Sequence, residues 1–104
     1  MADCERWVVS MTKDAAYVLK QIAASFNPAP FSNVKRKLIR MEVDPRDPAL
    51  GGTCYSGVIF LITLRSHVIE YAIAEADCRV YVTGIHRRDD SGRAPWFASV
   101  HLVP

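Results

Sequence analysis

Cysteine, glycine and long apolar runs are all scarce in this chain of 104 residues. Its three cysteines, Cys4, Cys54 and Cys78, include no CxxC pair and stand at no spacing typical of a Cys/His metal site. The odd count argues against a disulfide framework, so we expect reduced thiols in a cytoplasmic protein, with no metal and no other cofactor. The longest apolar run, Val58 to Ile62, falls far short of the roughly 20 residues of a membrane-spanning helix, and we expect no membrane partner.

A strong net charge is also missing, because 13 lysines and arginines face 11 acidic residues, for a net charge of +2. The total therefore does not identify a nucleic-acid-binding protein, but the charge is unevenly distributed. One basic cluster lies within six positions and consists of Lys35, Arg36, Lys37 and Arg40. The other falls near the C-terminus and consists of Arg79, Arg87, Arg88 and Arg93. Two local clusters suit an anionic partner, although a solvated helix face and a charged loop fit the same pattern.

Size and composition predict one folded domain. The chain is long enough for a single core and too short for two. Its content of 50% hydrophobic and 23% charged residues is typical of a globular protein. There is no internal repeat and no low-complexity segment, so we treat residues 1–104 as one domain, in which 92–104 can form a docking tail.

The first half of the chain predicts a strand and a helix. Apolar residues from Trp7 to Met11 favour a short strand, and Thr12 can cap the helix that follows. The spacing of one buried helix face is met by Ala15, Ala16, Val18, Leu19, Ile22, Ala23 and Phe26. Proline cannot continue a helix, so the segment Asn27-Pro28-Ala29-Pro30 ends it.

A second helix is predicted from about Asn33 to Glu42, with Ser32 or Asn33 as its cap. Its apolar side consists of Val34, Leu38 and Met41, with Ile39 beside them. The connection between the two helices is short, so we expect an antiparallel helical hairpin.

The second half predicts three strands. Asp-Pro and Gly-Gly pairs indicate a loop over residues 44–52. Residues 57–65 are apolar on both sides, which favours a strand inside the sheet with cover on both faces. After a tight turn at Ser66-His67, residues 68–75 alternate as a strand does, and residues 79–85 form the last one. Short connections make these strands an antiparallel meander.

The tail from Trp96 to Val103 is unusually apolar. Ala98, Val100 and Leu102 alternate with polar residues, which is typical of a further strand. A segment that docks on a partner has the same composition, and both interpretations stay open.

The order of these elements resembles that of the RelE/ParE family. Two local features add to the resemblance: Asp44-Pro45 lies near the end of the second helix, and the last strand ends in His86-Arg87-Arg88-Asp89. Members of this family are the small toxins of bacterial type II toxin–antitoxin pairs. The most similar stretches are Thr63-Leu64-Arg65-Ser66, Glu70-Tyr71-Ala72-Ile73 and residues 79–89. The resemblance extends to about Ser91. It implies an α+β fold, a helical hairpin packed on a mainly antiparallel four-stranded sheet (β-α-α-β-β-β), to which the C-terminal tail can add a strand.

The same resemblance implies a function. RelE-like members cut messenger RNA on the ribosome, ParE-like members poison DNA gyrase, and an antitoxin neutralises both. We therefore expect a growth-inhibiting toxin with a cognate antitoxin as partner, either an endoribonuclease that needs no metal or a gyrase poison. A homo-oligomer and a toxin–antitoxin hetero-oligomer both stay open. The alternative is a non-catalytic interaction module on the same fold, with the apolar tail as its docking segment.

Three consecutive residues are the catalytic candidates. Arg88 corresponds to the strand-end arginine of the family and can brace a scissile phosphate through a bidentate fork. Arg87 can assist it, and His86 carries the side chain most often used for general acid–base catalysis. A plain charged strand end, with the arginines paired to Asp89 and Asp90, is the alternative.

Further basic residues are candidates for RNA binding by charge. They are Lys35, Arg36, Lys37, Arg40 and Arg65. An acidic antitoxin or plain solvent would suit the helix cluster equally well. We expect His67 to be exposed in its turn and His101 to be incidental, with Tyr71 and Tyr81 in or beside the core.

The chain also departs from the catalytic RelE pattern. Family members carry lysines on the strand that reads Phe60-Leu61-Ile62-Thr63 here, and an arginine where this chain has Val68. Many also place a tyrosine after the final arginine, where this chain has Trp96, which cannot donate a phenolic proton. Several cations of a phosphate site are therefore missing, which weakens the prediction of a ribosome-dependent nuclease.

Overall fold

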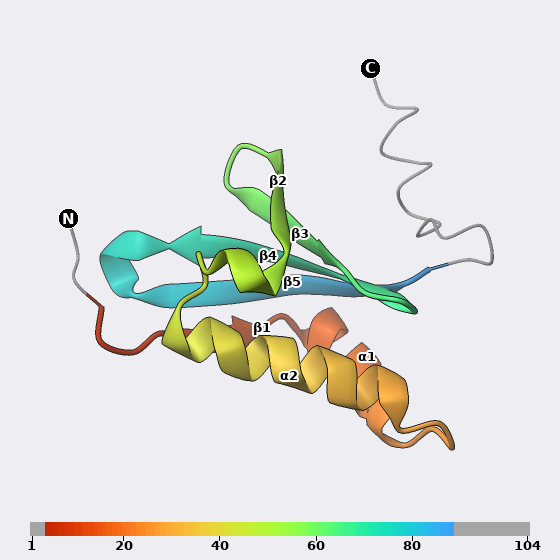
Figure 1. Cartoon of the computed structure of the whole chain (residues 1–104). Helices are drawn as coiled ribbons and strands as arrows, with labels where there is room; N and C mark the ends of the chain where they lie inside the picture. The colour runs from red at the N-terminus through yellow and green to blue at the C-terminus, as the bar shows by residue number, and fades with distance from the viewer. Residues whose placement is uncertain (1–3, 89–104) are drawn as a thin grey trace.

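The structure, a computed structural model, describes residues 4–88. A five-stranded sheet carries two helices on one of its faces (Figure 1). The helices are α1 (Lys13–Ala23) and α2 (Ala29–Val43), with short 3-10 helices η1 (Pro48–Leu50) and η2 (Glu75–Asp77). The strands are β1 (Val8–Met11), β2 (Gly52–Ser56), β3 (Ile59–Thr63), β4 (His67–Ala74) and β5 (Arg79–Arg87).

The sheet has the order β1-β5-β4-β3-β2. β1 runs parallel to β5, and every other neighbouring pair is antiparallel. The predicted α+β architecture, with a helical hairpin on a mainly antiparallel sheet, is therefore confirmed, but the sheet has five strands instead of the predicted four because β2 was not predicted. The proposed C-terminal strand and docking tail lie outside the described residues.

Helix α1 begins where the sequence predicts and ends earlier. The Thr12 hydroxyl accepts a hydrogen bond from the Ala15 backbone N–H at 3.2 Å, which caps the helix. At the other end the Ser25 hydroxyl donates to the Ile22 carbonyl at 2.7 Å, and the chain turns away. Phe26, which we expected on the buried face, is consequently fully exposed, because the helix stops at Ala23.

Helix α2 begins four residues earlier than predicted. Neither Ser32 nor Asn33 caps it, because the helix already starts at Ala29, with Pro30 in its first turn. Proline costs nothing there, since the first N–H groups of a helix have no partner within it. Val34, Leu38 and Met41 are buried as expected, whereas Ile39 is exposed. No helix among residues 4–88 is long and apolar enough to cross a membrane.

The loop predicted over residues 44–52 ends at Gly52, where strand β2 begins. Residues 52–56 pair with β3 as a hairpin, and Gly57 makes the turn at a positive φ of 57°. The strand predicted from Gly57 therefore starts at Ile59, because the glycine is needed for the turn. The prediction that this strand lies inside the sheet is confirmed, since β3 has β2 on one side and β4 on the other. The predicted cover on both faces is wrong for residues 4–88, because both helices pack on the same face of the sheet (Figure 1).

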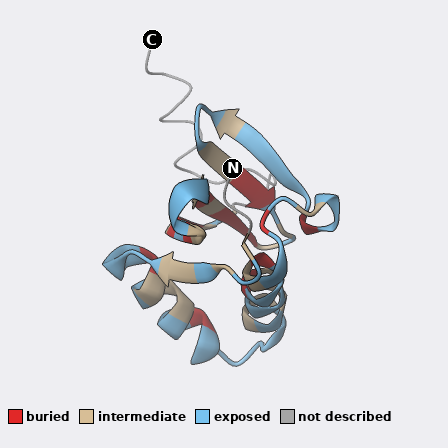
Figure 2. Ribbon diagram, turned by 90° about the vertical axis from the view of Figure 1, so that its left-hand side faces the viewer, coloured by how far each residue is buried: buried red, intermediate tan, exposed pale blue. Residues whose placement is uncertain are grey.

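The main core lies between the helices and the sheet (Figure 2). From the helices it takes Ala15, Ile22, Val34, Leu38 and Met41. From the sheet it takes Ile62, Ile69, Tyr71, Val80, Val82 and Ile85. A second, small cluster of Leu61 and Val68, with Tyr55 packed against it, forms apart from the main core. We call the sheet face that carries this small cluster the outer face, and the other the helix side.

The cysteines do not all remain reduced. Cys4 and Cys78 form a disulfide, with their Cα atoms 5.7 Å apart, which ties the N-terminal segment to the turn before β5. Our prediction of three free thiols is therefore wrong for these two and correct only for Cys54, which is free and exposed. Count and spacing could not reveal the pair, because the parallel alignment of β1 with β5 brings the two residues together.

Candidate functional site

Successive residues at the end of β5 belong to two different faces of the sheet. Between Glu70 and Tyr71 the pairing of β4 with β5 shifts register, so that Gly84 lies opposite Glu70 and Val82 opposite Tyr71. The extra residue reverses the alternation of side chains. Val82 and Ile85 are consequently both in the helix-side core.

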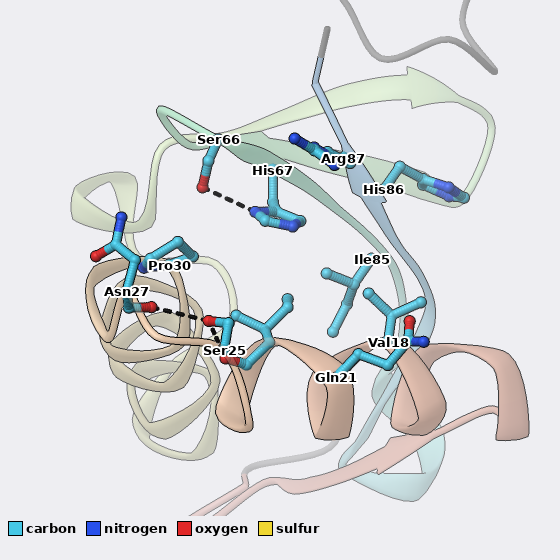
Figure 3. A pocket seen from close by; sticks show the side chains of 11 residues that line it. Val18, Gln21, Ser25, Asn27, Pro30, Ser66, His67, Ile85, His86 and Arg87 are labelled. Carbon is cyan, nitrogen blue, oxygen red and sulfur yellow. Dashed lines mark hydrogen bonds between the residues drawn. The ribbon is translucent and has the colours of Figure 1, made fainter.

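This reversal divides the predicted catalytic triplet. His86 lies opposite Val68, a member of the outer cluster, whereas Arg87 lies opposite His67. Figure 3 shows the side chains of His86 and Arg87 leaving the strand on opposite sides. Arg88 follows the alternation and belongs to the outer face with His86. The three residues nevertheless stay close at the strand end, because His86 and Arg87 line one groove and Arg87 and Arg88 line the hollow beside it.

On the outer face, His86 is paired with a carboxylate. Its Nε2 lies 3.1 Å from Oε1 of Glu70, and the two side chains are only 30% and 25% exposed. The pair lies over Gly84, where an added Cβ would collide with the imidazole and would lie 3.1 Å from the Glu70 oxygen. A hydrogen bond of this kind fixes the orientation of a histidine ring and the nitrogen that carries its proton.

Arg88 contributes to the fold as well as to the site. Its Nη1 donates to the Leu64 carbonyl oxygen at 2.6 Å, and its backbone N–H donates to the Ser66 carbonyl at 2.9 Å. Both bonds hold the turn between β3 and β4 against the end of β5. The guanidinium is thereby fixed at the same strand end as His86.

The resemblance implies cations within Phe60-Leu61-Ile62-Thr63 and at Val68, and this protein has none there: Leu61, Ile62 and Val68 are buried, whereas Thr63 is exposed. Leu61 is 6% exposed and Val68 is 2% exposed, and Tyr55 packs against both. The outer face therefore offers an imidazole, a carboxylate and a guanidinium beside an apolar cluster. Within residues 4–88, no three metal-ligating side chains are grouped so that they could hold a metal ion.

On the helix side, His67 lines a groove of about 670 Å³ between α1 and the end of β5 (Figure 3). Our prediction that His67 is exposed is wrong, because the residue is 9% exposed and begins β4 instead of ending a turn. Its Nδ1 lies 2.8 Å from the Ser66 hydroxyl. Arg87, which is exposed, lies opposite it across the strand pair.

The surroundings of His67 disfavour its protonated form. Burial lowers the pKa of the imidazole, and the positive charge of Arg87 lowers the pKa further. In the described part of the chain, no acidic side chain lines the groove. His67 is therefore neutral at pH 7.

A second hollow, of about 470 Å³, adjoins this groove where α2 begins. Arg65, Arg87 and Arg88 line it together with Asn27 and Asn33. Arg65 is exposed, and its side chain is therefore accessible to a phosphate group.

The basic cluster of α2 is engaged in local contacts. Lys37 Nζ donates to the Leu50 carbonyl at 3.0 Å, and Arg40 forms an ion pair with Asp47 at 3.2 Å, so both fix the η1 segment to the helix. Arg36 donates to the Asn33 side chain, and Lys35 lies over the Phe31 ring. None of the four lines the groove or the hollow at the end of β5.

The sheet order, the helical hairpin and the basic strand end define a RelE-type fold. Two solved structures share it. The isolated RelE toxin of E. coli matches with a TM-score of 0.65 and 13% sequence identity, over 91% of this chain and 95% of that chain. The toxin–antitoxin complex RelBE2 from Mycobacterium tuberculosis matches with a TM-score of 0.58 and 16% identity, over 86% of this chain and 100% of that chain.

The resemblance is thus confirmed for the fold. At these sequence identities the similarity extends to the course of the backbone and does not establish any shared catalytic or binding side chains. No protein-family model matches the chain, and no curated protein matches it in sequence.

Three residues of these sites were missed at the sequence level. Glu70 was read only as one polar position of an alternating strand, although its partner His86 lies 16 positions away. Gly84 drew no attention, and His67 was assigned to solvent. A signal for Glu70 and His86 existed in the pairing of two adjacent strands, but the register shift hides it from simple alternation.

Proposed function

We propose that this protein is the toxin of a type II toxin–antitoxin pair and that it cleaves RNA at its outer face. The observation that carries the proposal is the His86–Glu70 pair, with its N–O distance of 3.1 Å, next to Arg88 on a RelE-type fold. The isolated toxin and the toxin–antitoxin complex with the same fold support the first part. The chemistry of the outer face supports the second.

In this proposal His86 is the general base. Glu70 accepts a hydrogen bond from His86 Nε2 and holds the ring, and the imidazole takes the proton of the ribose 2′-hydroxyl. The 2′-oxygen attacks phosphorus to give a 2′,3′-cyclic phosphate, the bond to the 5′-oxygen breaks, and that oxygen takes a proton from water. Arg88 stabilises the charge that develops on the phosphate oxygens.

The rate that we expect from this site is modest. One electrostatic donor is worth about 2.7–4 kcal/mol of transition-state stabilisation in another enzyme, and here Leu61 and Val68 replace cations of the family pattern. This substitution favours the second candidate, a non-catalytic interaction module, more than any other feature. Gyrase poisoning has no specific observation in its favour.

We propose a cognate antitoxin as the partner, because one of the two structures with this fold is a toxin–antitoxin complex. Among residues 4–88, β2 is the last strand of the sheet, and an extended segment of a partner can pair with a strand in that position. We also propose that the toxin acts in the cytoplasm, where ribosomes and gyrase are found. A reducing cytosol would open the Cys4–Cys78 bond.

Induced expression in a bacterial host tests the proposal. The expected result is growth arrest, together with new RNA 5′-hydroxyl ends that are absent from a His86→Asn variant. Glu5→Gln is a matched control for changes at Glu70, because Glu5 is exposed and lies in the N-terminal segment.

Each contrary outcome has its own meaning. Arrest without RNA ends, accompanied by inhibited DNA supercoiling in vitro, would replace cleavage with gyrase poisoning. No arrest and no cleavage by the purified protein would reject the toxin and leave the interaction module.

A further inference from the structure

The groove and the hollow on the helix side adjoin, and Arg87, drawn in Figure 3 with the lining of the groove, also lines the hollow. The groove runs between α1 and the end of β5, and the hollow lies between the first turn of α2 and the turn that connects β3 to β4. The two share Asn27, Pro30, Ser66 and Arg87. A ligand that occupied both would therefore pass directly over Arg87.

The groove is suited to a flat ring with polar edges. Val18, Ile22 and Ile85 give it apolar surface, whereas Gln21 and His67 line it with groups that can hydrogen-bond. Ligand sites in proteins are typically hollows of roughly 300–1,000 Å³, and in this groove polar and apolar side chains contribute about equally to the lining. At about 670 Å³, the groove lies within that range.

The hollow, in contrast, is suited to a phosphate. Arg65 and Arg87 both line it, and none of the carboxylates within residues 4–88 lines either the hollow or the groove. Among residues 4–88, no ion pair engages either arginine. Guanidinium groups bind phosphate oxygens through two parallel hydrogen bonds, which a lysine cannot do. The first turn of α2 carries no acidic residue that would oppose an anion there.

We propose that the groove and the hollow together bind a phosphorylated nucleoside, with the base in the groove and the phosphate between Arg65 and Arg87. The base and the phosphate of such a ligand are adjacent, as the groove and the hollow are, so each part of the ligand meets the surface that suits it. An acidic peptide would satisfy the arginines but would leave the ring-shaped apolar surface unfilled. His86 lines the groove together with His67 and Arg87, whereas its partner Glu70 lines neither the groove nor the hollow, so nucleotide binding can be tested apart from the proposed cleavage.

Amide chemical shifts of the ¹⁵N-labelled full chain test this proposal. The probes are adenosine 3′-monophosphate, uridine 3′-monophosphate, adenosine, inorganic phosphate and a hexanucleotide of 2′-O-methyl RNA, which cannot be cleaved. We expect shifts at Gln21, Ser66, His67 and Arg87 with the nucleotides, at lower concentrations than with adenosine or phosphate alone. Tighter binding of the hexanucleotide would identify an RNA strand as the source of the nucleotide, and equal binding would identify the free nucleotide.

Matched variants locate the site. Arg87→Gln should weaken nucleotide binding at least about tenfold, because it removes a charge-assisted contact. Arg6→Gln is the control, since Arg6 is exposed and precedes β1. Glu70→Gln should leave nucleotide affinity unchanged, which separates this site from the proposed cleavage. Binding measured by calorimetry should reproduce the order that the chemical shifts give.

Three results would overturn the inference. The first is an absence of shifts in the groove at millimolar nucleotide, and the second is wild-type affinity in a folded Arg87→Gln variant. The third is binding of an octaglutamate peptide more tightly than of any nucleotide, which would make the surface a peptide site. If cleavage fails and nucleotide binding survives, only the proposed function of the outer face is lost.

Discussion

The two histidines near the end of β5 have opposite surroundings, although both belong to the same pair of strands. On the outer face His86 Nε2 lies 3.1 Å from the Glu70 carboxylate. On the helix side His67 has the Ser66 hydroxyl on one nitrogen and Arg87 nearby, and its pKa is lowered. Of the two rings, only His67 has a positive charge beside it that disfavours its protonated form, whereas His86 has a carboxylate as its partner.

This difference shows that neighbours in the sequence can belong to separate sites. His86 and Arg87 are adjacent, yet a strand directs their side chains to opposite faces. The experiments below use that separation. If a change on one face alters the function of the other, the division into two sites is wrong.

The largest effect should come from the disulfide at the far end of β5. Replacing Cys4 by serine should lower the free energy of unfolding by on the order of 4 kcal/mol, since the bond closes a loop of 74 residues. Both faces at the other end of the strand should keep their activities in protein that is still folded. Denaturant unfolding with intact and with reduced disulfide measures the stability.

Cys54→Ser is the matched control, because Cys54 is exposed and free. It should change stability by less than about 0.5 kcal/mol, as other surface substitutions do. Loss of RNA cleavage in folded Cys4→Ser would couple the disulfide to the site and contradict the independence of the two ends.

The next effect concerns the outer face alone. Glu70→Gln should reduce kcat for RNA cleavage about 10²-fold, at the lower end of what general acid–base groups contribute, because the imidazole loses the carboxylate that orients it. KM should change little, since Glu70 is not proposed to contact RNA. Steady-state kinetics with purified protein make the measurement. A raised KM with unchanged kcat would mean that Glu70 binds substrate instead.

Gly84→Ala tests the role of the His86–Glu70 pair through a steric clash. The new Cβ would collide with the His86 ring, and the strand has no room to move because Gly84 is itself buried. We expect a loss of about 1–3 kcal/mol in stability, as for other overpacked sites, together with lower cleavage activity. Nucleotide binding on the helix side should persist. Wild-type cleavage in this variant would argue that the His86–Glu70 pair is dispensable.

The order of elements could be predicted because local patterns determine it. The Thr12 cap and the spacing of Ala15 and Ile22 defined α1, and alternation defined β4 and β5. Strand β2 was missed because Gly51 and Gly52 indicate a loop, whereas the turn at Gly57 and the pairing with β3 decide its structure. Pairing partners are a property of the folded sheet, and no single segment carries them.

The sites could be predicted only in part, for the same reason. His86 and Arg88 were identified from the strand end, and both are on the outer face. Arg87 was grouped with them because simple alternation gives no hint of the register shift near Gly84. His67 was misassigned because the exposure of a residue after a turn depends on what packs over it. Here α1 and the end of β5 form the walls around it.

The smallest effect should be the contribution of His67 to the pH dependence of stability. Because burial and Arg87 lower its pKa in the folded state, the unfolded chain binds more protons below pH 6.5, the ordinary value for histidine. Stability should therefore fall as the pH drops below about 6.5, and it should level off once the pH is below the folded pKa.

Denaturant unfolding at pH 7.5 and 5.5 measures this dependence, and His67→Asn should show less of it than the wild type. Arg87→Gln should retain most of the dependence, because burial is the larger cause of the lowered pKa and the substitution leaves burial in place. A dependence that is identical in wild type and His67→Asn would assign it to other groups. In that case His67 would not be the neutral ring on which the contrast between the two faces rests.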